Sequence, residues 1–348
     1  MPDAGPRTTP GVGAAEARDI HRFAGSKGNG NAVTVIPACV RLPDDPEVPW
    51  EHAASVILEA SQGQSPLSLL TRKHLGMAPV ETLAPIVAGQ GEPPASYLQR
   101  LLQAIQVPLA AGSRPLLLAS SPVLAVTMEI ALRRFHKDAG ATVILSARPR
   151  VLQAGAGEMT IGYRALTAEP HIPLALVGTR SALAEEAPWI AERLRATEKE
   201  FQPRLTEIMA TTISNAGGQA LRLLIDRWKD RRIHVVVCAD VFDPSLIRQV
   251  PGPVPLGLTY EALVDIFSAI SECGQLSGVT FAGWYPRGAR DDPEAQFMAY
   301  ALAAIVEHIL GCVASTSDLV SQDTKFTGEA DLLGEDGTEG PLPEGAFG

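Results

Sequence analysis

The segment from residue 232 to 262 constrains the fold of this chain more than any other. It opens with an apolar, β-branched run, Ile233–Cys238, which is too short for a helix and has the pattern of a strand buried on both faces. Asp240 and Asp243 follow at its C-terminal end, and the Pro/Gly-rich residues 244–257 predict a long ordered loop before the next helix. In an α/β sheet, a strand end of this kind is where ligands bind.

Strand and helix patterns alternate along most of the chain. This alternation predicts a single-domain α/β fold, with one parallel sheet and helices on both faces. We expect strands at 32–39, 116–119, 141–147, 173–177, 233–238 and 278–284. We expect helices at 51–59, 95–105, 123–136, 183–194, 218–228 and 293–311, and one that begins at Thr259.

The two ends of the chain have the composition of disordered segments. Residues 1–31 are rich in Gly, Pro and Ala, so we place the folded domain at 32–312. The tail, 313–348, holds eight acidic residues and one basic residue, which is a net charge of −7 out of −10 for the whole chain. Its short apolar islands, Leu332-Leu333 and Ala346-Phe347, suit a docking segment for another protein. The alternative is an inert, solubilising tail.

The composition also bears on the partners and the location of the protein. Hydrophobic residues make up 46% of the chain, which is ample for a large core. The sequence has no basic stripe or aromatic platform, so we expect no nucleic-acid partner. We find no apolar run long enough to span a bilayer, no signal pattern at the N-terminus and no CxxC pairing among the four cysteines. We therefore expect a cytoplasmic protein that does not bind membranes and has reduced thiols.

The segment around Asp240 resembles the signature of the arginase/agmatinase ureohydrolase family. That signature is Asp-x-Asp-x-x-Asp-Pro, a Gly/Pro loop, then Gly-Gly-Leu-Thr and a helix. The corresponding residues here are Cys238, Asp240, Asp243, Pro244, Gly257, Leu258 and Thr259. Other segments resemble further family motifs in the same order and spacing: RPLLLASSPVLA, ATVILSARPRV, IPLALVGTRSALAEE, VTFAGWYP and DDPEAQFMAYALAAIVEHILG. The resemblance implies an arginase-like fold.

The resemblance also implies that this is a degenerate member, because most metal ligands are missing. Family members hold two manganese ions with His and Asp ligands, and those positions fall on Pro122, Ser146, Arg148, Arg150, Cys238 and Asp240. Of these, only Asp240 can bind a hard cation as the family does. The glutamate that grips the guanidinium substrate falls near Gly283, and a further histidine falls near Ile161. We therefore expect no metal, no cofactor and no catalytic residue of the family type.

The same strand ends define a former active-site pocket. We assign to it Ser121, Pro122, Ser146, Arg148, Arg150, Cys238, Asp240, Asp243 and Gly283. Buried carboxylates without partners are costly, so we expect Arg148 and Arg150 to replace the metal ions and to pair with the two aspartates. The alternatives are that both arginines face solvent, or that the Arg/Ser/Asp cluster binds a small anion.

These residues lead to a non-catalytic interpretation. We expect a ureohydrolase-fold pseudoenzyme that acts as a structural or regulatory partner subunit, in a homo-oligomer or in a hetero-oligomer with another enzyme. One alternative is a metal-independent enzyme or anion binder at the former site; another is a hydrolase of guanidino or amide C–N bonds with a rebuilt metal site. A Cys238 nucleophile with His234 as its base is excluded, because four strand residues separate the two side chains by ~13 Å.

Overall fold

The computed structural model of the chain describes part of its length. The described residues are 33–40, 53–62, 80–136, 140–149, 172–182, 184, 186–197, 205–216, 219–228, 231–272, 276–285 and 293–315. The expected disorder of 1–31 lies outside these ranges, as does the tail beyond residue 315.

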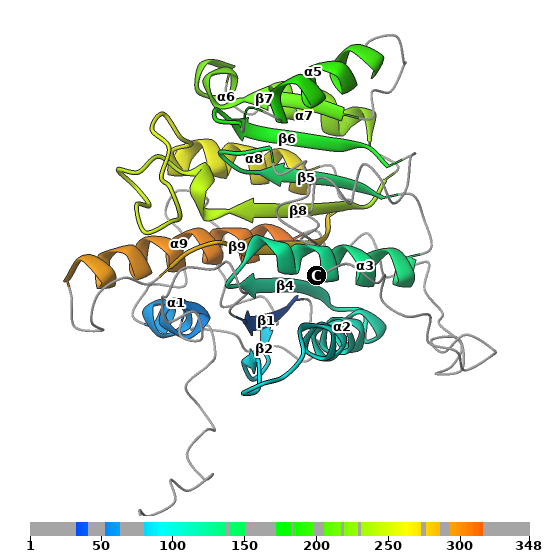
Figure 1. Ribbon diagram of the computed structural model, residues 1–348, viewed down its shortest axis with the longest axis vertical. Coiled ribbons are helices and arrows are strands. Elements are labelled where there is room, and N and C mark those ends of the chain that lie inside the picture. The colour runs from blue at the N-terminus through cyan, green and yellow to red at the C-terminus, as the bar shows by residue number, and fades with distance from the viewer. Residues whose placement is uncertain are drawn as a thin grey trace, which may run out of the picture.

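Strands and helices alternate through the described residues (Figure 1). The strands are β1 (Val33–Cys39), β2 (Val80–Thr82), β3 (Ile86–Val87), β4 (Arg114–Ala119), β5 (Ala141–Leu145), β6 (Leu174–Thr179), β7 (Leu205–Met209), β8 (Ile233–Cys238) and β9 (Leu276–Ala282). The helices are α1 (Ala53–Gln62), α2 (Pro94–Ala110), α3 (Ala125–His136), α5 (Glu186–Thr197), α6 (Ala210–Ala216), α7 (Gln219–Arg227), α8 (Tyr260–Glu272) and α9 (Pro293–Ser315). Two short 3-10 helices are η3 (Pro122–Leu124) and η4 (Ala239–Val241).

One sheet joins all of these strands. Its order is β2-β1-β4-β9-β8-β5-β6-β7, with β3 also paired to β1, and every pairing between these strands is parallel. Because β4, β9, β8 and β5 are consecutive neighbours in this order, their carboxyl ends meet at one edge of the sheet. The predicted α/β class, with one parallel sheet and helices on both faces, is confirmed.

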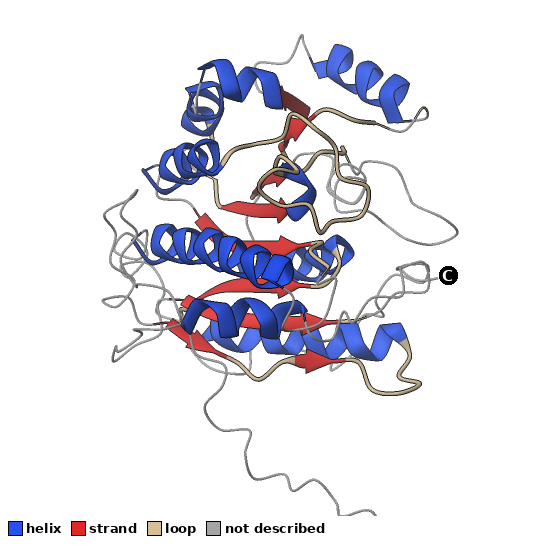
Figure 2. Cartoon of the chain, turned by 90° about the vertical axis from the view of Figure 1, so that its left-hand side faces the viewer, coloured by secondary structure: helices blue, strands red, loops and turns tan. Residues whose placement is uncertain are grey.

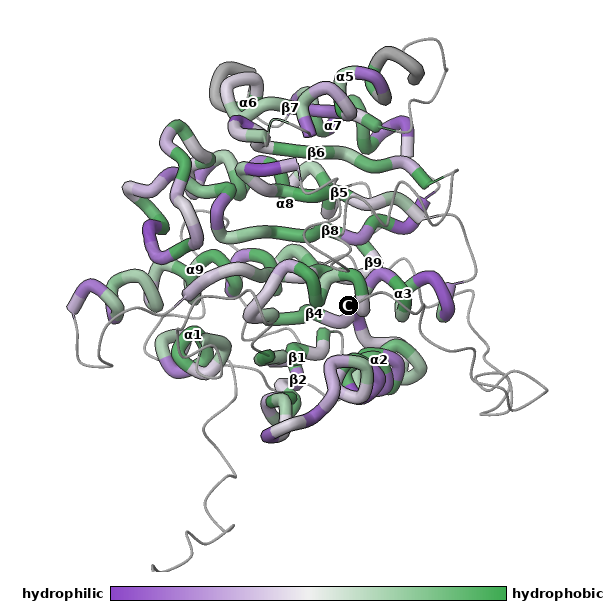
Figure 3. Tube along the Cα trace, in the orientation of Figure 1, coloured by the Kyte–Doolittle hydropathy of each residue, from purple (hydrophilic) through white to green (hydrophobic). Residues whose placement is uncertain are grey.

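Alternating side chains on each strand form two faces of the core. One face, which includes Val35, Leu116 and Val235, packs against α1, α8 and α9. The other, which includes Ile36 and Leu117, packs against α2 and α3. Figure 2 shows the strands stacked along the long axis with helices packed against them, and Figure 3 shows hydrophobic residues running through β4, β6 and β8. Burial on both faces explains why these strands have continuous apolar sequences.

Several short elements were not predicted. They are β2, β3, β7 and α6, all of seven residues or fewer. The edge strand β7 carries Thr206 and Glu207, so it lacks the unbroken apolar run of the central strands. Helix α9 continues to Ser315, three residues beyond the expected domain end at 312.

Helix α9 corrects one expectation about the membrane. The stretch Pro293–Val313 has a mean hydropathy of 1.5 and is long and apolar enough to cross a bilayer, so the statement that no such run exists is wrong. Its inner residues, such as Leu302, Val306 and Ile309, are fully buried against the rest of the domain. It is the only described helix that passes this test of length and composition, and its packing is that of a core helix.

Candidate functional site

The residues assigned to the former active site lie at the carboxyl edge of four neighbouring strands. Ser121 and Pro122 follow β4, Ser146 and Arg148 follow β5, Asp240 and Asp243 follow β8, and Gly283 follows β9. In Figure 1 the arrowheads of β4, β6 and β8 point to the side where the loop between η4 and α8 lies. Of the assigned residues, Arg150 lies outside the described part of the chain, as does Ile161.

Asp240 is held by protein donors from the neighbouring strand. It lies in η4 and its side chain is 2% exposed. Its Oδ1 accepts hydrogen bonds from the Ser146 hydroxyl at 3.0 Å and from the Ala147 N–H at 3.3 Å. The Ser146 oxygen in turn accepts from the Arg148 N–H at 3.2 Å. A carboxylate held in this way joins the end of β8 to the end of β5.

Asp243 joins the two ends of the long loop between η4 and α8. Its Oδ1 accepts from the Ser245 N–H at 2.9 Å and its Oδ2 accepts from the Gly257 N–H at 3.1 Å. Hydrogen bonds from the Ser245 side chain and backbone, and then from other loop amides, lower the pKa of Asp243. A Cβ on Gly257 would lie 2.3 Å from the Asp243 nitrogen, so this close approach requires glycine. Asp243 is therefore a structural anchor of the loop.

Arg148 does not form the expected ion pair with Asp240 or Asp243 within the described residues. Its guanidinium donates instead to the carbonyl oxygens of Pro251 at 3.2 Å and Gly252 at 2.9 Å. The sequence argument assumed that buried carboxylates needed a cation. Both aspartates instead have N–H or O–H donors close by, so the arginine is directed to loop carbonyls.

Arg180 is the site residue that the sequence argument missed. It follows β6, and its half-buried guanidinium donates to main-chain carbonyls at both ends of the loop. The acceptors and distances are Gly178 (3.2 Å), Asp240 (2.9 Å), Val241 (3.0 Å), Phe242 (3.0 Å), Val254 (2.8 Å) and Pro255 (3.0 Å). Burial lowers the pKa of Arg180, while the charges of Asp240 and Asp243 oppose that shift. The one sequence signal was its position at a strand end in the Gly-Thr-Arg segment.

Three other assigned residues pack as part of the scaffold. Ser121 caps η3 by accepting a hydrogen bond from the Val123 N–H at 3.4 Å. Gly283 has a φ of +81°, and a Cβ there would meet the Pro122 ring at 3.3 Å. Cys238 is fully buried in an apolar cluster with Ile144 and Leu176, among others. Pro122 and Gly283, which the sequence analysis assigned to one pocket, thus lie close together through packing of the proline ring.

The described donors at this edge do not suit a pair of hard cations. Among the described residues, no group of three or more His, Cys, Asp or Glu side chains is placed to hold a metal ion. Asp240 is the one carboxylate at the positions that the resemblance assigns to ligands, and the cationic Arg148 lies at another. Such a set does not fit the oxygen and imidazole ligands that manganese requires.

Comparisons with known proteins agree with the fold. Residues 162–311 match the model of the arginase family. The chain is 33% identical over 82 residues to the N(1)-aminopropylagmatine ureohydrolase of Thermus thermophilus, a match that covers 23% of this chain and only 26% of that enzyme.

Solved structures extend the likeness to most of the chain. The agmatine ureohydrolase of Thermoplasma volcanium has a TM-score of 0.65 at 17% identity, covering 84% of this chain and 94% of that one. The formimidoylglutamase of Bacillus subtilis has a TM-score of 0.67 at 18% identity, covering 88% and 95%. The arginase of Bacillus subtilis has a TM-score of 0.64 at 17% identity, covering 81% and 99%. At these identities the structures establish a common fold.

Proposed function

For this chain, which belongs to the arginase family and has the ureohydrolase fold, we propose the role of a pseudoenzyme. It lacks a di-manganese centre and acts as a structural or regulatory partner subunit in the cytoplasm. Its partner is a second copy of the chain or another enzyme subunit, and the acidic tail serves as a further docking segment.

The environment of Asp240 is the observation that carries this proposal. This is the one family ligand position that still has a suitable side chain, and its carboxylate accepts hydrogen bonds from Ser146 and Ala147. The guanidinium groups of Arg148 and Arg180 lie at the same edge and are tied to the loop. Two divalent cations beside two guanidinium groups would be strongly repelled.

An anion binder at this edge has less support. Its strongest donors would be the guanidinium groups, and those of Arg148 and Arg180 already donate to carbonyl oxygens. A ligand would have to break several charge-assisted hydrogen bonds before making its own. The Arg/Ser/Asp cluster therefore acts as a brace for the loop.

Metal content and urea release test the loss of catalysis. We expect the purified protein, after dialysis, to hold no stoichiometric manganese, zinc or nickel, and to release no urea from arginine or agmatine with added manganese. One or more metal ions per chain, or manganese-dependent urea release, would contradict the proposal.

A variant that restores the family ligands is the matched control. It combines Pro122→His, Ser146→Asp, Arg148→His, Arg150→Asp and Cys238→Asp. If the missing side chains alone explain the loss, this variant should bind manganese under conditions where the native chain does not. Equal manganese binding by both proteins would mean that the native site holds metal in another way.

Assembly tests the partner role. We expect light scattering to give a mass above that of one 36.8 kDa chain, or co-expression with an intact ureohydrolase to yield a mixed assembly. A protein that stays monomeric at every concentration and does not assemble with an intact relative would rule out the subunit role.

A further inference from the structure

The outer edge of helix α9 carries two exposed aromatic side chains. Among the exposed large hydrophobic residues of the described chain, Phe297 (61% exposed) and Tyr300 (48% exposed) are the two that share an element. They lie three positions apart, so they are neighbours on one face of the helix. Single exposed apolar residues are common on protein surfaces, whereas adjoining aromatic residues are typical of interfaces. This edge of α9 is therefore a candidate contact surface.

The rest of this edge is uncharged. Between Phe297 and Val313, the residues of α9 that are not buried are Phe297, Tyr300, Ala301, Ala304 and Gly311. Their spacing of three, four and seven residues places them along one stripe of the helix. The titratable side chains in this stretch, Glu307 and His308, are buried. The chain has a formal net charge of −10, so an uncharged stripe is a surface on which two like-charged copies can approach.

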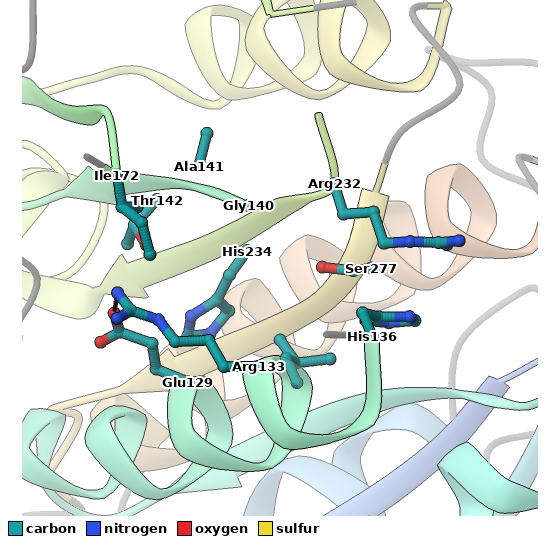
Figure 4. A pocket seen from close by; sticks show the side chains of 11 residues that line it. Glu129, Arg133, His136, Gly140, Ala141, Thr142, Ile172, Arg232, His234 and Ser277 are labelled. Carbon is teal, nitrogen blue, oxygen red and sulfur yellow. Dashed lines mark hydrogen bonds and ion pairs between the residues drawn. The ribbon is translucent and has the colours of Figure 1, made fainter. Parts of the chain in front are cut away.

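Helix α3, which packs on the opposite face of the sheet, has a different outer surface. Its last turn holds Arg133 and Arg134, and Arg133 pairs with Glu129 beside the small cavity of Figure 4. Charged side chains of this kind are what a helix on a protein surface turns toward solvent. The aromatic stripe is therefore not a general property of the helices that cover this sheet.

The stripe has a large half and a small half. Phe297 and Tyr300 lie toward the start of α9, and Ala304 and Gly311 lie toward its end. A second copy can pack antiparallel about a two-fold axis that passes between residues 300 and 301. This arrangement places Phe297 of each copy opposite Ala304 of the other, so a large side chain meets a small one at both ends of the contact.

We propose that two copies of the chain form a dimer in this way, through the aromatic stripe of α9. The inference rests on the proposed function, since it names the partner and the surface by which the subunit assembles. A second copy is the occupant that the stripe fits, because the large half and the small half of one helix supply the complement of each other.

Light scattering and sedimentation of the full chain test the dimer. We expect the native mass to be twice that of one 36.8 kDa chain, or an even multiple of it. Phe297→Ala should raise the Kd of the dimer at least about tenfold, as the loss of an interface anchor does. Leu223→Ala is the matched control, because Leu223 is 60% exposed but lies on α7, and its Kd should equal the native value. An equal effect of the two variants, or no effect of Phe297→Ala, would overturn the proposal.

Exchanging the two side chains tests the antiparallel arrangement. Ala304→Phe alone should weaken the dimer, and the double variant Phe297→Ala with Ala304→Phe should recover most of the native affinity. A double variant that is no tighter than the single ones would overturn the pairing. If Ala304→Phe does not fold, Tyr300→Cys decides. Its thiol lies beside the proposed axis and should form a cross-linked dimer on oxidation, whereas that of Leu223→Cys should not.

The possible outcomes separate this inference from the proposed function. A native trimer, or an oligomer that Phe297→Ala leaves intact, would overturn the α9 contact while the subunit role stands. A monomeric chain that assembles only with an intact ureohydrolase would do the same. A monomer that binds lipid vesicles through Phe297 would assign the stripe to a membrane surface and reject the dimer. A chain that stays monomeric and binds neither would reject both the dimer and the subunit role.

Discussion

Replacing Arg180 with alanine should destabilise the protein far more than replacing an ordinary surface arginine. The Arg180 guanidinium binds main-chain carbonyls of both the start and the end of the loop between η4 and α8, including Asp240, Phe242 and Val254. Hydrogen bonds to a charged donor contribute about 1.5–3 kcal/mol each when fully buried. The side chain is only half-buried and water can replace some of these donors, so we expect a total loss of about 2–4 kcal/mol.

Alanine variants of two further arginines serve as comparisons for the loss of stability in Arg180→Ala. Arg148 donates to two carbonyls of the same loop, one of them exposed, and its loss should cost about 1 kcal/mol. Arg248 is on the same loop and forms an exposed ion pair with Glu294 at 3.6 Å, so Arg248→Ala should change stability by less than about 0.5 kcal/mol. Arg180→Lys should recover only a small part of the loss, because an ammonium group cannot reach the spread of acceptors that the guanidinium fork does.

Urea unfolding followed by circular dichroism measures the free energies of unfolding, and hydrogen exchange gives a local readout. In Arg180→Ala the amides of Gly257 and Leu258, which bond back to the start of the loop, should lose protection first. If Arg180→Ala costs no more than Arg248→Ala, or leaves the exchange of these amides unchanged, the loop does not depend on the arginine and our account of the site is wrong.

Three other outcomes can be measured on the same protein. Gly257→Ala should cost more than about 3 kcal/mol, because its Cβ would clash with the Phe242–Asp243 backbone; a loss below 1 kcal/mol in thermal or urea unfolding would contradict the geometry. Burial raises the pKa of Glu307 to about 7, above its unfolded value, so its contribution to stability is complete below about pH 4.5 and is lost as the pH rises through 7. In Glu307→Gln, the fall in Tm between pH 5 and 8 should shrink; an unchanged pH profile would refute this. Deleting residues 331–348 should leave Tm unchanged, and a fall of several degrees would mean that the tail packs on the domain.

The central strands could be predicted from the sequence because a strand that is buried on both faces has a nearly continuous run of apolar residues. Runs such as the one at Val235 contain apolar residues on both faces, so they are recognised without knowledge of their neighbours. The edge strand β7 faces solvent on part of its surface, and its Thr206 and Glu207 look like loop residues. Its existence depends on pairing with β6, a contact that a local pattern does not contain.

The strand ends that carry the assigned residues could be predicted to be neighbours, but the hydrogen bonds of those residues could not. Strand order brings Asp240, Ser146 and Arg148 to one edge, as the pattern of strand ends implied. The partner of each arginine could not be inferred, because the acceptors are main-chain carbonyls, which every residue has. Complementary charge suggested Asp240 and Asp243 as partners for Arg148, but local N–H and O–H donors already satisfied those carboxylates.

Arg148 and Arg180 hold the loop between η4 and α8 through hydrogen bonds to its main-chain atoms. Arg148 and Arg180 donate hydrogen bonds to the carbonyl oxygens of residues 251, 252, 254 and 255, all of which are main-chain acceptors. The side chains at the loop tip, such as the 75% exposed Leu256, therefore do not enter these hydrogen bonds. The exposed side chains of this segment could therefore be replaced to build a new binding surface, provided that Gly252 and Gly257 are kept, without removing the hydrogen bonds that hold the loop.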